Sequence, residues 1–169
     1  MSAIVGVSDH GGWAILVTVD AGGTLLDRRR VELVDEGFPK IPHHVEAQRL
    51  PLDQAVALVE RVRASAERNA THCLNALPAE FEISGIALRQ CPALPRTIAE
   101  RITNYRARNN ADWVMYREAL AAAAEARGWA VFWYDAKKFA DARAKKPPDP
   151  PWTKDHRLAM AAAIAARKA

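Results

Sequence analysis

The chain has 169 residues, of which half are hydrophobic, and a formal net charge of +4 at neutral pH. A chain of this length is expected to form one globular domain that buries roughly 70% of its unfolded surface. It contains no apolar run near the roughly 18 residues needed to cross a bilayer, so we expect no membrane association. Cys73 and Cys91 match no disulfide or metal-binding spacing, which favours buried thiols in a reducing, cytoplasmic setting.

Short apolar runs open the chain. Residues 3–8 and 13–20 are rich in Val and Ile, and they flank Asp9-His10-Gly11-Gly12, whose glycines suit a tight hairpin. A third run over residues 25–34 is interrupted by Asp27-Arg28-Arg29-Arg30, and such charges are typical of an edge strand. The sequence therefore predicts a three-stranded antiparallel meander.

Helical spacing follows the meander. Residues 35–51 contain one glycine and three prolines and predict an irregular loop. Residues 52–75 carry apolar side chains at three- and four-residue intervals, which predicts an amphipathic helix. Residues 83–88 then predict a short fourth strand, because prolines on both sides limit its length.

The second half of the chain repeats this alternation. Residues 97–127 predict helix, with a break near Asn109-Asn110, and residues 129–134 form an apolar run typical of a strand buried on both faces. A last helix is expected from Trp152-Thr153 onward. This order predicts an α/β domain with a mixed five-stranded sheet, in which three antiparallel strands precede a βαβ unit and helices flank the sheet.

Basic residues gather toward the last part of the sequence. Residues 136–169 contain nine Lys or Arg against three Asp. This local excess favours binding to a polyanion such as nucleic acid, although a solvated basic surface would have the same composition. The candidate contacts to the nucleic-acid backbone are Lys137, Lys138, Arg143, Lys145, Lys146, Lys154 and Arg157.

Two further kinds of motif are weak or absent in the sequence. His43-His44-Val45-Glu46 contains residue types that bind zinc, but no Cys or His lies at an established partner spacing, so a polar loop is the preferred interpretation. The sequence has neither a Gly-Lys-Ser/Thr phosphate loop nor a Gly-x-Gly-x-x-Gly turn after a strand, which argues against nucleotide-dependent activity.

The order of elements resembles the ribonuclease-H-like superfamily, and within it the RuvC-like Holliday junction resolvases. Ile4-Val5-Gly6-Val7-Ser8-Asp9 is similar to the first acidic strand of that family, and Lys154-Asp155-His156-Arg157-Leu158-Ala159-Met160-Ala161-Ala162-Ala163 is similar to its closing helix. The resemblance implies a single ribonuclease-H-like domain over residues 1–169 and a nucleic-acid partner. Because RuvC-like enzymes commonly act as dimers, it also implies that the chain could form a homodimer.

The same resemblance implies phosphodiester hydrolysis with Mg²⁺ or Mn²⁺. In a two-metal mechanism, carboxylates hold the ions roughly 4 Å apart across the scissile phosphate. By resemblance, Asp9 would bridge the two ions and Asp155 would bind one of them. Each residue also has an ordinary role, since aspartate is a favoured turn residue and a negative charge stabilises the first turn of a helix.

The sequence departs from the family pattern at two positions. Gln90 stands at the end of the fourth strand, where the family usually carries an acid, and Leu158 stands one turn beyond Asp155, where a second acid is expected. Asp135, after the fifth strand, could replace one of these metal ligands, Gln90 could offer a neutral oxygen, and His156 could act as ligand or base.

Two functions therefore remain open at the level of sequence. The first is a metal-dependent nuclease that acts on structured or branched nucleic acid, with Asp9, Asp155, Asp135 and His156 as its catalytic residues. The second is a ribonuclease-H-like module that has lost its catalytic acids and binds nucleic acid or a protein partner.

Overall fold

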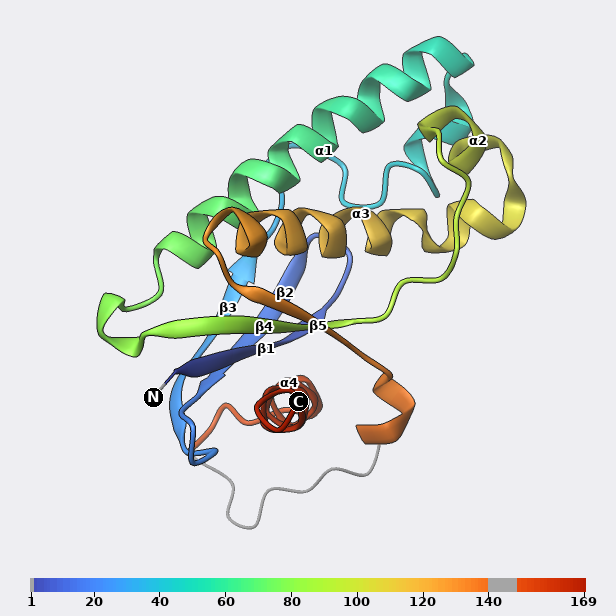
Figure 1. Cartoon of the computed structure of the whole chain (residues 1–169). Coiled ribbons are helices and arrows are strands. Elements are labelled where there is room, and N and C mark those ends of the chain that lie inside the picture. The colour runs from blue at the N-terminus through green and yellow to red at the C-terminus, as the bar shows by residue number, and fades with distance from the viewer. Residues whose placement is uncertain (1, 140–148) are drawn as a thin grey trace.

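The computed structural model describes residues 2–139 and 149–169 and contains a mixed five-stranded sheet (Figure 1). Its spatial order is β3-β2-β1-β4-β5. β1 pairs antiparallel with β2, and β2 pairs antiparallel with β3, whereas β4 runs parallel to both β1 and β5. The predicted meander and βαβ unit are therefore confirmed. The strands are β1 (Ala3–Asp9), β2 (Trp13–Val19), β3 (Leu25–Glu32), β4 (Ile83–Arg89) and β5 (Ala130–Tyr134).

Helices cover the two faces of the sheet unequally. α1 (Leu52–Asn75) and α3 (Tyr105–Ala126) pack on one face, with the short α2 (Ile98–Thr103) beside them, whereas α4 (Lys154–Ala166) packs on the other (Figure 1). Single 3₁₀ turns, η1 to η3, lie at Glu46–Arg49, Ala79–Phe81 and Ala136–Phe139. In the part of the chain that the structure describes, no helix is long and apolar enough to span a membrane.

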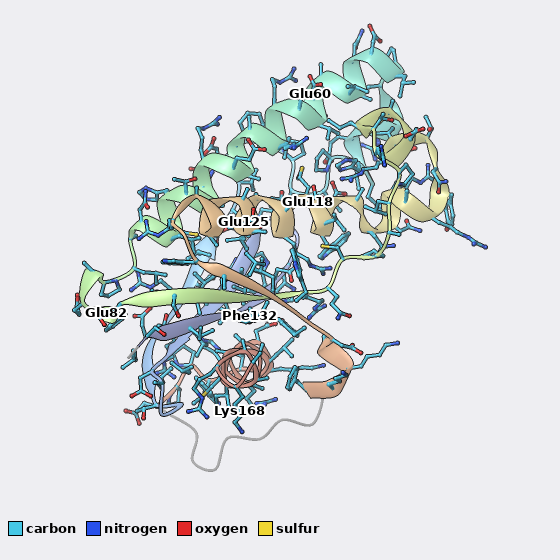
Figure 2. All side chains as sticks on the ribbon, in the orientation of Figure 1. Glu60, Glu82, Glu118, Glu125, Phe132 and Lys168 are labelled. Carbon is cyan, nitrogen blue, oxygen red and sulfur yellow. The ribbon has the colours of Figure 1, made fainter. Side chains whose placement is uncertain are left out.

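Alternating side chains on the strands build a separate core on each face. Val5 and Val7 of β1 point toward α1 and α3, whereas Ile4 points toward α4. Side chains fill the space between the sheet and the helices on both faces (Figure 2). The α4 layer is thin because its buried face consists mainly of alanines, namely Ala159, Ala162, Ala163 and Ala166.

Gly6 sets how closely α4 approaches the sheet. A β-carbon at this position would lie 1.8 Å from the backbone oxygen of Ala159, so a larger residue would push the helix away. The Gly6 position thus explains why small residues line α4 and why its first turn lies directly beside the end of β1.

The helical stretch over residues 97–127 breaks at Asn104, not at the predicted Asn109-Asn110. The side-chain oxygen of Asn104 accepts a hydrogen bond from the backbone nitrogen of Ala107 at 3.0 Å and so caps a new helix. Asn109 and Asn110 are exposed on the surface of α3, where their side chains leave the backbone ladder intact.

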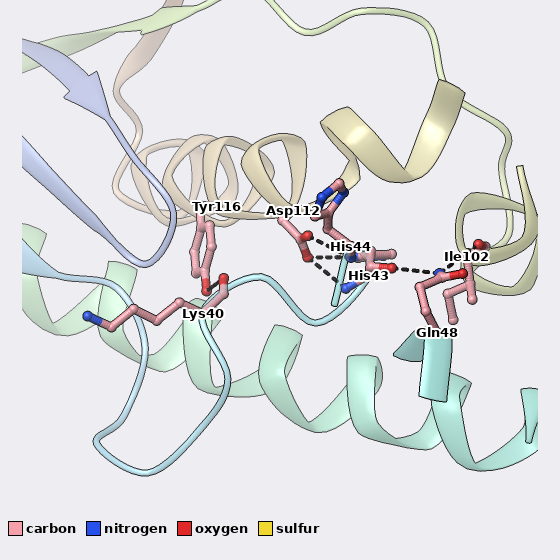
Figure 3. A network of polar contacts seen from close by, with 7 residues as sticks. All are labelled: Lys40, His43, His44, Gln48, Ile102, Asp112 and Tyr116. Atoms are coloured by element: carbon pink, nitrogen blue, oxygen red, sulfur yellow. Dashed lines mark hydrogen bonds and ion pairs between the residues drawn. The ribbon is translucent and has the colours of Figure 1, made fainter. Parts of the chain in front are cut away.

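A buried polar network anchors the loop before α1 to α3 (Figure 3). The Asp112 carboxylate accepts hydrogen bonds from the backbone and ring nitrogens of His43, at 3.0 and 2.7 Å, and from the backbone nitrogen of His44. Gln48 donates to the backbone oxygens of His43 and Ile102. The side chains of His43 and Asp112 are 2% and 0% exposed, so the predicted polar loop has a buried, hydrogen-bonded anchor.

The two cysteines are free thiols. Cys73 lies on the buried face of α1, and burial raises the pKa of its thiol to about 11. Cys91 is half-buried, and burial also raises its pKa. Both thiols are therefore protonated and weakly nucleophilic at neutral pH.

Candidate functional site

Asp9 lies at the end of β1 on the face covered by α3. The Arg117 side chain of α3 donates from Nε to the Asp9 carboxylate at 2.8 Å, and the two side chains are 7% and 1% exposed. Arg117 also donates from Nη1 to the backbone oxygen of Gln90 at 3.0 Å. A buried guanidinium therefore balances the charge of Asp9 and joins the ends of β1 and β4.

Asp155 lies in the first turn of α4, on the opposite face of the sheet. Its carboxylate accepts hydrogen bonds from Ser8 Oγ at 2.7 Å and from His10 Nε2 at 2.8 Å. Burial acts to raise the pKa of Asp155, but these hydrogen bonds outweigh it and leave the pKa below its ordinary value. Ser8 and His10 flank Asp9 in sequence, and because successive strand side chains alternate, Asp9 points away from Asp155.

The other predicted ligands have separate partners. Asp135 accepts a hydrogen bond from the backbone nitrogen of Lys137 at 3.0 Å and begins the η3 turn. The buried His156 ring accepts a hydrogen bond at Nδ1 from the backbone nitrogen of Thr153 at 3.1 Å, which caps α4. Burial lowers the pKa of His156, and the nearby charge of Arg28 lowers it further. The Gln90 side chain is exposed.

These positions do not suit a two-metal centre. Within residues 2–139 and 149–169, no three His, Cys, Asp or Glu side chains gather closely enough to hold a metal ion. Two divalent ions require several carboxylates on one side of the scissile phosphate, whereas Asp9 and Asp155 lie on opposite faces. The charge of Asp9 is, in addition, already balanced by Arg117.

A basic cavity lies at the N-terminal end of α4. Its volume is about 240 Å³, and we call it the cationic cavity because Arg89, Lys137, Lys154 and Arg157 line it together with Ala136, Phe139 and Leu158. The four cations come from the end of β4, the η3 turn and the first turn of α4. Within the described residues, none of the four forms an ion pair with a carboxylate, and the lining contains no acid.

Three of the residues predicted to contact a nucleic-acid backbone line this cavity, namely Lys137, Lys154 and Arg157. Lys138 is exposed beside it, and Arg143, Lys145 and Lys146 lie outside the described residues. Arg89 is an addition that the strand pattern could have revealed. It lies two residues beyond Ala87, whose side chain contributes to the α4 core, so both point to the same face.

The sheet order and the helical layers define the ribonuclease-H-like fold of the α/β class. The chain is similar to RuvC of Thermus thermophilus in complex with a Holliday junction substrate, with 16% identity, a TM-score of 0.50, and coverage of 97% of this chain and 91% of that chain. A second Thermus thermophilus RuvC structure is 15% identical, with a TM-score of 0.47 and coverage of 96% and 91%. The similarity to the junction-bound RuvC structure confirms the predicted resemblance to RuvC-like resolvases at the level of the fold.

No protein-family model matches the sequence, and no curated protein matches it either.

Proposed function

We propose that this chain is a ribonuclease-H-like domain that binds nucleic acid through the cationic cavity without using the predicted two-metal centre. The observation that carries the proposal is the convergence of Arg89, Lys137, Lys154 and Arg157 on one cavity, where the lining formed by the described residues contains no acid.

Electrostatics makes a phosphate backbone the fitting partner for this cavity. Four like charges held close together repel one another, and a polyanion relieves that repulsion while releasing its own counterions. Guanidinium groups can also bind phosphate through two parallel hydrogen bonds. The N-terminus of α4, where Lys154 and Arg157 lie, adds a positive partial charge. The Holliday junction bound to the RuvC structure of similar fold supports a nucleic-acid partner.

The positions of the acids favour binding without two-metal hydrolysis. Asp9 already has a buried guanidinium partner, and Gln90 supplies no charge. Because the sheet separates Asp9 from Asp155, these two carboxylates cannot share a pair of ions. The second function derived from the sequence, a binding module, is therefore the better supported one.

Metal-dependent cleavage remains a second candidate because of Asp155. Its carboxylate is 27% exposed and directly follows Lys154, which lines the cationic cavity. Mg²⁺ commonly binds through one or two carboxylates together with substrate phosphates. Asp155 could thus hold one Mg²⁺ or Mn²⁺ ion against a phosphate in the cavity, without any contribution from Asp9.

Binding can be tested by fluorescence anisotropy with linear and branched DNA and RNA at several salt concentrations. We expect affinity to fall steeply with salt, and we expect Lys154→Gln to weaken binding to all sequences and reduce the salt slope by about one. Lys168→Gln is the matched control, since Lys168 is exposed at the other end of α4 (Figure 2). The proposal would be overturned if the protein bound none of these substrates in a salt-sensitive way.

Cleavage is tested with the same complexes in the presence of Mn²⁺. Intact substrate after prolonged incubation is the expected result. Cleavage that Asp155→Asn abolishes and Asp9→Asn leaves unchanged would establish the one-metal candidate instead. Loss of cleavage in both variants, with Asp9→Asn shown to be folded by circular dichroism, would restore the two-metal interpretation.

A further inference from the structure

The cationic cavity has an apolar side that a site for backbone phosphate alone does not need. Ala136, Phe139 and Leu158 line it together with the four cations. Pockets for small organic groups combine an apolar wall with a few convergent polar groups, and they begin at about 300 Å³. A cavity of about 240 Å³ is close to this lower limit, so it suits one compact group that is partly apolar and partly anionic.

The apolar side is held in place by its neighbours. Leu158 lies one helical turn after Lys154, so both side chains are on the same side of α4. The Phe139 ring packs edge-on against Tyr134, with centroids 5.9 Å apart, and the Tyr134 hydroxyl donates to the backbone oxygen of Val7 at 2.5 Å. The aromatic wall is therefore tied through Tyr134 to the central strand β1.

The polar side of the cavity contains hydrogen-bond donors that are not all paired with acceptors. Arg89 lines the cavity, and its Nε atom is buried with no acceptor among the described residues. Buried donors are normally paired, so the Arg89 guanidinium has donor capacity left for a further acceptor. Three other cations share the same lining, and the acceptor that they favour is strongly anionic.

We infer that the cationic cavity receives the terminal nucleotide of a strand that carries a 5′-phosphate. This inference rests on the proposed nucleic-acid binding. An internal phosphodiester carries one negative charge, whereas a terminal phosphate monoester carries about −1.5 to −2 at pH 7, which better balances four cations. The base or sugar of the terminal nucleotide lies against Phe139 and Leu158, since stacking on an aromatic ring tolerates any base.

The test compares single strands of one sequence, labelled at the 3′ end and carrying either a 5′-phosphate or a 5′-hydroxyl. The native protein is expected to bind the phosphorylated strand about tenfold more tightly, the effect of one charge-assisted hydrogen bond. Lys137→Gln, Arg89→Gln and Phe139→Leu should each reduce this ratio toward one. Lys138→Gln is the matched control. Lys138 follows Lys137 but does not line the cavity, so its loss weakens both complexes equally and preserves the ratio.

Each outcome separates this inference from the proposed function. Equal, salt-sensitive affinities of the native protein for both strands would overturn the terminal-nucleotide assignment and leave nucleic-acid binding standing. No binding of either strand would overturn both. Competition with adenosine 5′-monophosphate distinguishes a free nucleotide from a strand end. If the free nucleotide displaces the phosphorylated strand as well as an unlabelled strand does, the assignment to a strand end is overturned.

Discussion

The two faces of the sheet differ in whether their charged side chains have partners of opposite charge. On the face covered by α1 and α3, buried ionisable groups are paired with each other, as in Asp9 with Arg117 and His43 with Asp112. On the face covered by α4, the four cations of the cationic cavity have no carboxylate partner among the described residues. Paired buried charges fix a structure, whereas unpaired charges at a surface are available to a ligand. The contrast separates residues that hold the fold from residues that would hold a partner.

The largest effect should come from breaking the Asp9–Arg117 pair. Arg117→Met leaves the Asp9 carboxylate buried without its cation, and we expect the free energy of unfolding to fall by about 3–5 kcal/mol. Denaturation with urea measures this loss. The double substitution Asp9→Leu with Arg117→Met removes both charges and should return most of the stability. A double variant as unstable as the single one would show that the charge pair is not the cause.

The next largest effect is expected from substituting Asp112, which anchors the loop before α1 on the same face. Asp112→Ala removes the acceptor for three hydrogen bonds and leaves the His43 ring buried without its partner. We expect a loss of about 2–4 kcal/mol in the free energy of unfolding, measured by the same urea titration. Asp112→Asn keeps one acceptor oxygen and should lose less. Equal losses in the two variants would contradict the role of these hydrogen bonds.

The α4 face should respond to substitution in the opposite sense. Lys154 is a cation in the first turn of a helix, where the helix dipole disfavours positive charge. Lys154→Glu should therefore raise the free energy of unfolding by about 0.3–1 kcal/mol while it abolishes nucleic-acid binding. Thermal unfolding and anisotropy on the same sample measure both effects. A variant that loses stability together with binding would remove the distinction between the two faces.

The smallest effect concerns the pH dependence of the α4 cap. Burial, aided by the charge of Arg28, keeps the pKa of folded His156 below its ordinary value, so the unfolded chain binds more protons in mildly acidic solution. The contribution of His156 to stability is thus complete above about pH 6.5 and is lost as the pH falls. The lowered pKa of Asp155 adds a second loss at more acidic pH.

His156→Gln isolates the histidine contribution. Glutamine at this position of a capping box also bonds the backbone nitrogen before the helix, so the cap is retained. We expect the difference in Tm between pH 7 and pH 5 to shrink. His44→Gln, at an exposed histidine, is the control and should leave the difference unchanged. An unchanged difference in His156→Gln would contradict the assignment.

The sequence predicted the fold far better than the site, because the two depend on different ranges of interaction. Strands and helices follow from local periodicity, and their order left few α/β topologies. The helix break was misplaced because capping by Asn104 depends on one side-chain hydrogen bond, which composition does not reveal.

The candidate site depends on the direction of single side chains. Asp9 and Asp155 were expected to share one edge, yet a one-residue step along β1 turns Asp9 toward α3 while Ser8 and His10 contact Asp155. Arg117 lies 108 residues from Asp9 in sequence, and nothing in the pattern of α3 predicts its partner. Arg89, by contrast, could have been found by counting two residues from Ala87 along β4.

The contact between α4 and Gly6 has a consequence for the synthesis of the protein. Ser8 and Asp155, which join the same two elements, are 147 residues apart in sequence. The apolar side chains of β1 and β2 on the α4 face therefore stay uncovered on the ribosome until α4 has emerged. During that interval, the Val- and Ile-rich strands can pair with other nascent chains. The domain therefore stays prone to aggregation until α4 has been synthesised.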